Sequence, residues 1–263
     1  MVRDSISLVH ATSHAKINWS LRIIGKRADG FHDLETIFQT ISLHDELTFR
    51  DADRLSLTCD DPTIPTDHTN LVLRAARAVN APPTAIELKK RIPAGGGLGG
   101  GSSNAATTLL TLGAGRDDLA ELALNLGSDV PFFLLGGTAY ATGRGEVLTP
   151  IAPMNGIPLL LLLPEERMLT KDAFSRITRY SQPLGIEAYS RGYDVFTNDF
   201  EEPVFAMLPR LRELTERLYA AGATFAAMSG SGSTLFGAFE SAAARDRAAA
   251  LFEDVRVERA DSI

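Results

Sequence analysis

The sequence has very little cysteine, no long apolar run and no excess of basic residues. Its single cysteine, Cys59, excludes an intrachain disulfide and any metal site built from several cysteines. The longest aliphatic run, from Ile157 to Leu163, is too short to cross a bilayer. Residues 1–16 hold no apolar stretch of the kind that a signal peptide needs. We therefore expect a cytoplasmic protein that has no membrane partner.

The charge balance is acidic. The chain has 26 Lys and Arg against 33 Asp and Glu, which gives a formal net charge of −7. Non-specific binding to nucleic acid requires a broad basic surface, so we expect no nucleic-acid partner. An acidic protein that binds phosphate groups has to use backbone amides, a few well-placed cations and a metal ion. A length of 263 residues allows one large domain or two medium ones.

The most informative segment is residues 93–105, which read Pro-Ala-Gly-Gly-Gly-Leu-Gly-Gly-Gly-Ser-Ser-Asn-Ala. Residues 85–92 before it alternate between apolar and polar, as a strand does, and residues 104–112 after it favour a helix. Free N–H groups at a helix start bind anions, and glycines let the backbone approach a phosphate closely. The segment therefore predicts a loop that binds the phosphates of a nucleotide. A flexible linker is disfavoured because the loop lies tightly between a strand and a helix.

Other phosphate-binding loops fit this segment less well. A Walker A loop ends in Gly-Lys-Ser/Thr, but here Ser102 follows Gly101 directly. The dinucleotide fingerprint matches at Gly95, Gly97 and Gly100, yet the preceding strand is too charged to be buried on both faces. A protein-kinase glycine loop lacks its His-Arg-Asp and Asp-Phe-Gly partners in this chain. A dinucleotide-dependent oxidoreductase remains an alternative at this point.

Three further patterns are candidates for chemistry. Lys16 and Asn18 point to the same side of a strand expected over 15–24, where a lysine stabilises negative charge, but a solvated polar face has the same pattern. Asp129, within Gly-Ser-Asp-Val-Pro, fits both a helix cap and a general base. The Ser-Gly-Ser-Gly-Ser loop at 229–233 has more glycine than a hairpin needs, which favours close approach to a ligand.

Phe31 and His32 follow an Asp-Gly turn at 29–30. A core phenylalanine beside a surface histidine is the simpler interpretation. An aromatic ring and an imidazole are also suited to stack on a nucleobase and to hydrogen-bond it. The pattern alone leaves both interpretations open.

Proline and glycine between residues 150 and 158 mark a domain boundary, so we expect domains over 1–152 and 153–263. Beyond this boundary the expected order, apart from one extra helix, is β-α-β-β-α-β, which is the ferredoxin-like order. Before it, in addition to the strand and the helix that flank the glycine-rich segment, we expect two strand regions, two helices and a hairpin. These are strands over 15–24 and 33–57 (the latter broken near 44–45 and 51–53), helices over 70–80 and 117–126, and a hairpin over 138–148.

Taken together, these motifs resemble the GHMP small-molecule kinases, a family that includes galactokinase, homoserine kinase and mevalonate kinase. The resemblance rests on Ala15-Lys16-Ile17-Asn18, on Pro93–Ser103 and on Ser229–Ser233. It implies an α+β fold with an S5-like N-terminal domain and a ferredoxin-like C-terminal domain, and phosphoryl transfer from ATP with Mg²⁺.

Four other segments resemble one branch of this family: residues 27–32, 36–39, 127–133 and 196–201. In that branch the acceptor is the 2-hydroxyl of a methylerythritol linked to cytidine diphosphate, on the non-mevalonate route to isoprenoid precursors. Another GHMP kinase is a less favoured alternative, because its acceptor would have no base for Phe31 and His32 to stack on.

The resemblance implies a role for each matching residue. Asp129 would accept the proton of the acceptor hydroxyl, Lys16 would orient Asp129 and favour the alkoxide, and Asn18 would position the acceptor. The residues expected to hold the cytidine are Phe31, His32, Thr170 and Phe174. Those expected to contact ATP are Asn70, Lys90, Pro93, Ala94, Gly95, Gly96, Gly97, Leu98, Gly99, Gly100, Gly101, Ser102 and Ser103.

The Mg²⁺ ligands are not identified by the sequence, although Ser102 or Ser103 is a candidate. Two positions depart from the family pattern, since His14 stands where a proline is usual and Phe31 where a tyrosine is usual. The second change keeps a stacking ring and loses a hydroxyl. A nucleotide-binding regulator that has lost catalysis is disfavoured by the presence of Lys16, Asn18 and Asp129 together. The oligomeric state is left open, with a homodimer as one alternative.

Overall fold

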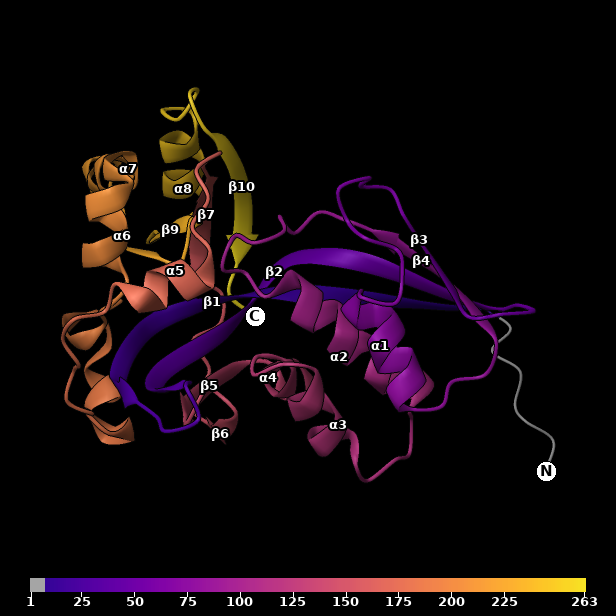
Figure 1. The fold of residues 1–263 in the computed structure, drawn as a ribbon. Helices are drawn as coiled ribbons and strands as arrows, with labels where there is room; N and C mark the ends of the chain where they lie inside the picture. Colours follow the sequence, from indigo (N-terminus) through magenta and orange to yellow (C-terminus); the bar gives the residue numbers. More distant parts are fainter. Residues whose placement is uncertain (1–7) are drawn as a thin grey trace. The chain divides into compact units, whose positions relative to one another are not determined.

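The computed structural model describes residues 8–263, which divide into two compact units (Figure 1). Each unit is assembled from three stretches of chain. These are, for unit 1, the chain up to Ala15, His44–Ala94 and Gly99–Leu135, and, for unit 2, Lys16–Leu43, Gly95–Leu98 and Gly136–Ile263. The two long strands at the start of the chain therefore contribute residues to both units.

The strands are β1 Val9–Lys26, β2 His32–Asp51, β3 Ser56–Cys59, β4 Thr84–Lys89, β5 Thr138–Thr142, β6 Val147–Pro150, β7 Pro158–Leu163, β8 Phe225–Met228, β9 Leu235–Ala238 and β10 Arg256–Asp261. The α-helices are α1 Leu71–Ala78, α2 Gly100–Leu112, α3 Leu119–Leu126, α4 Val130–Leu135, α5 Thr170–Ser175, α6 Glu201–Met207, α7 Pro209–Ala220 and α8 Ala242–Ala249, and η1 is a 3₁₀ segment at Ile186–Val195.

In unit 1, β4 lies between β3, to which it is parallel, and the Glu46–Asp51 part of β2, to which it is antiparallel. Alternate residues of these strands, such as Phe49 and Ile86, are buried with apolar residues of α1. Helix α2 packs against α1, α3 and α4 around a second buried cluster. These contacts position the N-terminus of α2.

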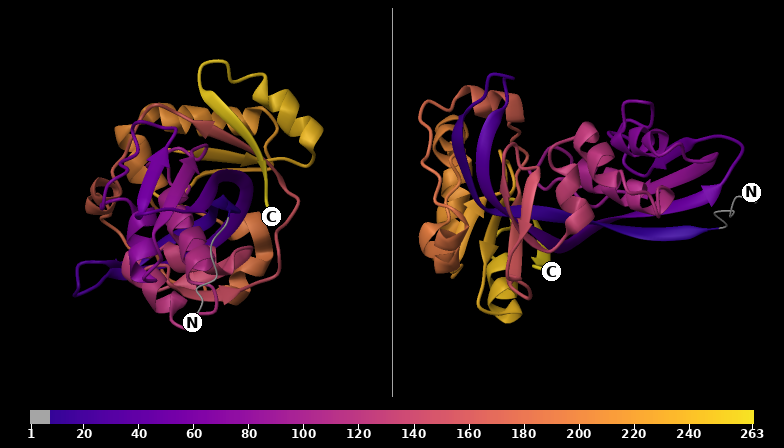
Figure 2. Two further views of the ribbon diagram at one scale, coloured as in Figure 1. Left: turned by 90° about the vertical axis from the view of Figure 1, so that its right-hand side faces the viewer. Right: turned by 90° about the horizontal axis from the view of Figure 1, so that it is seen from below.

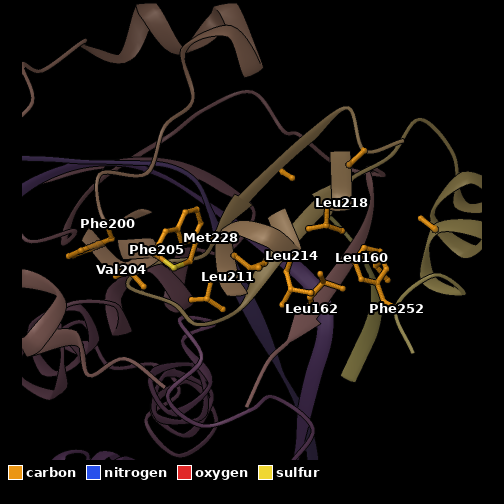
Figure 3. Close-up of a cluster of buried hydrophobic side chains, with 14 of the residues drawn as sticks. Leu160, Leu162, Phe200, Val204, Phe205, Leu211, Leu214, Leu218, Met228 and Phe252 are labelled. Atoms are coloured by element: carbon orange, nitrogen blue, oxygen red, sulfur yellow. The ribbon is translucent and has the colours of Figure 1, made fainter. Parts of the chain in front are cut away.

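In unit 2, the C-terminal strands form an antiparallel sheet in the order β10-β7-β9-β8. Helices α7 and α8 lie on one face of this sheet (Figures 1 and 2). Their apolar residues form one buried cluster with Leu160 and Leu162 of β7 (Figure 3). The ferredoxin-like prediction is therefore confirmed, with α6 and η1 as additions that the sequence did not predict. None of the helices in residues 8–263 combines the length and apolarity that crossing a bilayer requires.

The predicted break in the second strand region near residues 44–45 is wrong, because β2 continues through this point to Asp51. A buried strand tolerates a polar side chain that is hydrogen-bonded, and the carboxylate of Asp45 accepts several hydrogen bonds. The predicted break near 51–53 is confirmed, since β2 ends at Asp51 and β3 begins at Ser56.

Candidate active site

The polar face of β1 is buried in the middle of the strand, where Lys16 and Asn18 lie. Lys16 and Asn18 are only 4% and 2% exposed, so the simple interpretation of a solvated face is wrong. The ammonium Nζ of Lys16 donates to Oδ1 of Asn18 at 2.6 Å and lies 5.2 Å from the centre of the Phe38 ring. The amide of Asn18 in turn donates to Oγ1 of Thr36 at 2.8 Å. This hydrogen bond orients Asn18, so its Oδ1 is held toward the lysine.

The loop between β8 and β9 packs against part of the glycine-rich loop in unit 2. Ser229 Oγ donates to the carbonyl oxygen of Gly97 at 3.0 Å, and Thr234 N–H donates to that of Gly96 at 3.2 Å. On the same segment, Leu98 accepts from the backbone N–H of Lys16 at 3.0 Å. The structure thus brings together Lys16, Asn18, residues 95–98 and the serine–glycine loop that the sequence singled out.

Gly97 has no room for a side chain. Its φ is +79°, and a Cβ at this position would lie 2.0 Å from the carbonyl oxygen of Ser229. We therefore expect Gly97→Ala to displace the two loops from each other and to raise the KM for ATP by about tenfold or more, because backbone atoms cannot yield as a flexible side chain does. Steady-state kinetics with varied ATP would measure the effect.

Gly115→Ala is the matched control for this change. Gly115 has a nearly equal φ of +81°, but a Cβ there would meet nothing within 4 Å. The Gly115→Ala variant therefore introduces the same kind of backbone strain without a steric clash of the new Cβ. Equal kinetic effects from the two variants would show that strain, and not the approach of Ser229, explains the need for glycine at position 97.

The remainder of the glycine-rich loop belongs to unit 1. Helix α2 begins at Gly100, and Gly99 before it has a left-handed φ of +70°. Ser103 Oγ donates to the carbonyl oxygen of His14 at 2.6 Å and shares a hydrogen bond with Ser13 Oγ at 2.7 Å. Within residues 8–263 the Ser102 hydroxyl makes no such hydrogen bond, and this side chain is half-buried. Ser102 is therefore the serine whose oxygen is available to a ligand.

Asp45 connects both ends of this loop. One carboxylate oxygen accepts the N–H groups of Arg91 and Ile92, at 2.7 and 2.9 Å, just before the loop. The other accepts from the ammonium of Lys90 and, at 2.9 Å, from the side-chain amide of Asn104 in α2. The side chains of Asp45 and Lys90 are 0% and 6% exposed. A single buried carboxylate therefore fixes the end of the strand relative to the start of helix α2.

We expect Asp45→Asn to lower the free energy of unfolding by about 3–5 kcal/mol, because it leaves the Lys90 ammonium buried without its charge partner. Urea unfolding would measure this loss. Glu46→Gln is the control, since its ion pair with Lys89 is exposed and should contribute less than about 1 kcal/mol. Adding Lys90→Met to Asp45→Asn should recover part of the stability. If the double variant were no more stable than Asp45→Asn, the charge explanation would fail.

Two of the residues expected near ATP have clear structural partners. Asn70 caps helix α1, since its Oδ1 accepts the N–H of Val72 at 2.9 Å while its Nδ2 donates to the carbonyl oxygen of Pro65 at 2.6 Å. Lys90 has its ammonium on Asp45. Their roles in nucleotide binding stay predictions. The ion pair of Lys90 was not evident from the sequence, because Asp45 lies 45 residues away along the chain. The partners of Asn70, in contrast, lie within five residues of it.

Asp129 lies in the turn immediately before α4 and is half-buried. The turn is closed by a hydrogen bond from the N–H of Val130 to the carbonyl oxygen of Gly127 at 3.2 Å. Val130 and Phe132, which follow, are fully buried and anchor the short helix. The carboxylate is therefore carried at the end of a fixed element, which is the placement that a positioned base requires.

The residues predicted to hold a nucleobase lie close together in unit 2. The rings of His32 and Phe174 stack at 4.6 Å with an interplanar angle of 16°. Phe31 is 49% exposed, and the guanidinium of Arg144 lies 4.5 Å from its ring centre. Thr170 shares a hydrogen bond with Ser231 at 2.9 Å. Burial lowers the pKa of His32, and the nearby charge of Lys26 lowers it further, so the imidazole is neutral at pH 7.

Two family models match the chain, GHMP kinases N terminal domain over residues 70–137 and GHMP kinases C terminal over residues 181–254. A protein of Chlorobium luteolum (strain DSM 273 / BCRC 81028 / 2530), named 4-diphosphocytidyl-2-C-methyl-D-erythritol kinase, is 43% identical in an alignment 260 residues long, which covers 89% of this chain and 89% of that protein. The chain belongs to the GHMP kinases. The predicted family is thus confirmed, and the chain is a small-molecule kinase.

Solved structures agree with this assignment. A crystal structure of 4-(cytidine 5'-diphospho)-2C-methyl-D-erythritol kinase is 35% identical and aligns with a TM-score of 0.85, over 97% of this chain and 99% of that one. The mevalonate kinase of Methanococcus jannaschii aligns over 98% of this chain and 99% of that one with a TM-score of 0.71, but at 14% identity. This second likeness shows the shared fold alone.

Proposed function

We propose that this kinase transfers the γ-phosphoryl group of ATP to the 2-hydroxyl of 4-diphosphocytidyl-2-C-methyl-D-erythritol. Both relatives described above, at 43% and 35% identity, are named for a kinase of this acceptor. The observation in the chain itself that supports it is the ring group of Phe31, His32 and Phe174. Acceptors such as homoserine or mevalonate have no base that these rings could stack on.

In this mechanism Asp129 accepts the proton of the hydroxyl as the oxygen attacks the γ-phosphorus. The ammonium of Lys16 stabilises the developing alkoxide, and Asn18, which Thr36 orients, positions the acceptor. The glycine-rich loop presents backbone N–H groups to the phosphates at the start of α2. The neutral imidazole of His32 offers one donor and one acceptor to the edge of the cytosine.

Mg²⁺ belongs to this proposal as the metal that accompanies ATP. Within residues 8–263, no three His, Cys, Asp or Glu side chains come together as a ready metal site. Mg²⁺ commonly takes few protein ligands and is held largely by phosphate oxygens and water, so the available hydroxyl of Ser102 fits it. When bound, the ion would spread the charge of the transferring phosphoryl group.

Two broader expectations stay part of the proposal. We infer that residues 1–152 and 153–263 correspond to the two domains of the family, and that the enzyme acts in the cytoplasm. Limited proteolysis with mass spectrometry would test the boundary near residue 152, and cell fractionation would test the location.

Coupled ADP release with ATP and Mg²⁺ tests the function directly. We expect turnover with 4-diphosphocytidyl-2-C-methyl-D-erythritol and none with mevalonate or homoserine. Turnover with one of those two controls would support the kinase activity but contradict the assignment of a cytosine-binding site. Absence of turnover with all three, in folded protein that binds ATP, would contradict the proposed acceptor.

Phe31→Ala is expected to raise the KM for the cytidyl acceptor by about 5- to 150-fold, which corresponds to the 1–3 kcal/mol of one base–aromatic stack. The KM for ATP should not change, because the exposed ring of Phe31 serves the acceptor alone. Phe31→Tyr keeps the ring and is the matched control, with a KM near the wild-type value. An equal rise in both KM values after Phe31→Ala would count against this assignment.

A further inference from the structure

The segment from Phe196 to Glu201 stood out in the sequence, yet the proposed reaction uses none of its residues. Asn198 in this segment is only 6% exposed. Its Nδ2 donates to two carbonyl oxygens, those of Met228 at 2.7 Å and Gly230 at 2.8 Å. Its Oδ1 accepts the N–H of Phe200 at 3.0 Å, which orients the amide. Both amide hydrogens of Asn198 are therefore donated to backbone carbonyls of the two residues next to Ser229.

Glu201, at the start of α6, also binds the corner of the chain formed by Met228–Gly230. Its Oε1 accepts the N–H of Met228 at 2.7 Å, so Met228 is bound at its N–H by Glu201 and at its carbonyl by Asn198. Strand β8, which ends at Met228, is the last strand of its sheet and needs partners outside it on its open side. The side chain of Met228 also lies in one cluster with Phe200 and Phe205 (Figure 3).

The segment is tied to β1 as well. Leu21 donates its N–H to the carbonyl oxygen of Thr197 at 2.7 Å and accepts the N–H of Asp199 at 2.9 Å. The carboxylate of Asp199 accepts the N–H of Ile23 at 2.7 Å. Hydrogen bonds therefore join the segment to β1, the strand that carries Lys16 and Asn18. Asn198 joins the same segment to the loop after β8.

We propose that Asn198 is a positioning residue, which fixes the Met228–Gly230 corner so that Ser229 stays against Gly97. This inference rests on the proposed function, because its consequence is the placement of the backbone that binds ATP phosphates. Asn198 acts only through the carbonyls that it holds. Without it those carbonyls lose a buried donor, and the contact from Ser229 to Gly97 loosens.

The test compares Asn198→Ala with a variant that weakens the same core elsewhere. Phe252→Leu lies in the same buried cluster as Met228 and lowers stability without touching the loop. We expect Asn198→Ala to speed amide hydrogen exchange at residues 229–234 beyond the rate in Phe252→Leu under conditions of matched global stability. We also expect the KM for ATP to rise about tenfold.

Glu201 supplies a second pair of variants if Asn198→Ala does not fold. Burial raises the pKa of Glu201 to about 7, against the opposing effects of the Met228 N–H and Arg212, so the neutral amide of Glu201→Gln is a close replacement. Glu201→Gln keeps an acceptor for Met228 and should behave as wild type. Glu201→Ala removes it and should speed exchange at the same amides.

Exchange at residues 229–234 no faster than in Phe252→Leu, together with an unchanged KM for ATP, would overturn the positioning role. Hydrogen exchange needs no substrate, so it tests Asn198 independently of turnover. A wild-type enzyme that failed to phosphorylate the cytidyl acceptor would contradict the proposed function alone. Accelerated exchange in Asn198→Ala would still support the role of this side chain in holding the corner.

Discussion

Replacing Asp129 by asparagine is expected to lower kcat by about 10²- to 10⁴-fold while both KM values stay close to wild type. Asparagine has the shape of aspartate and begins helices equally well, so the turn before α4 keeps its structure. What it loses is the ability to accept a proton. The variant therefore separates the two interpretations that the Gly-Ser-Asp-Val-Pro pattern left open, a helix cap and a general base.

Asp117→Asn is the control for Asp129→Asn. Asp117 is an exposed carboxylate in the same unit, so its replacement removes the same charge away from the proposed chemistry. Its kcat should match wild type. Should Asp129→Asn also retain a near-native kcat, with substrates turned over normally, then Asp129 is not the base and its role is confined to the start of the helix.

The glycine-rich loop could be predicted from sequence because its signal is local. A strand pattern, a run of glycines and a helical run follow each other within about thirty residues, and each is fixed by backbone preferences that neighbouring residues express. Even there the start of α2 lies four residues earlier than expected, at Gly100. Glycine disfavours helix, so propensity alone delays the start, whereas packing of α2 on α1, α3 and α4 overrides it.

Asp45 and Asn198 show what the sequence could not provide. Asp45 resembles a strand break because a buried carboxylate is unfavourable unless partners exist, and its partners at 90–92 and 104 lie more than forty residues away. Asn198 stood out as part of a motif, but its partners Met228 and Gly230 are about thirty residues further on. Polar residues that act through distant backbone groups leave no periodic pattern to detect.

The alternation of polar and apolar residues on β1 could not predict that Lys16 is buried, because this pattern is the same whether the polar face contacts solvent or lines a site. Burial makes the lysine informative, because an ammonium that is 4% exposed has to be held by defined partners. Asn18 is one such partner, and the Phe38 ring contributes a second favourable contact. The cost of enclosing this charge is consistent with a role in stabilising an anion.

Lys16→Met is expected to lower kcat by about 10²- to 10³-fold, the range found when one preorganised donor to a developing oxyanion is removed. Methionine fills a similar volume without the charge, and the backbone N–H that donates to Leu98 is retained, so the strand should stay in place.

Lys89→Met, on the exposed face of β4, is the control for loss of one positive charge and should leave kcat unchanged. Lys16→Arg keeps the charge but not the compact ammonium, and it should recover only part of the rate. A native kcat in Lys16→Met would mean that the ammonium serves the hydrogen bond to Asn18 and takes no part in phosphoryl transfer.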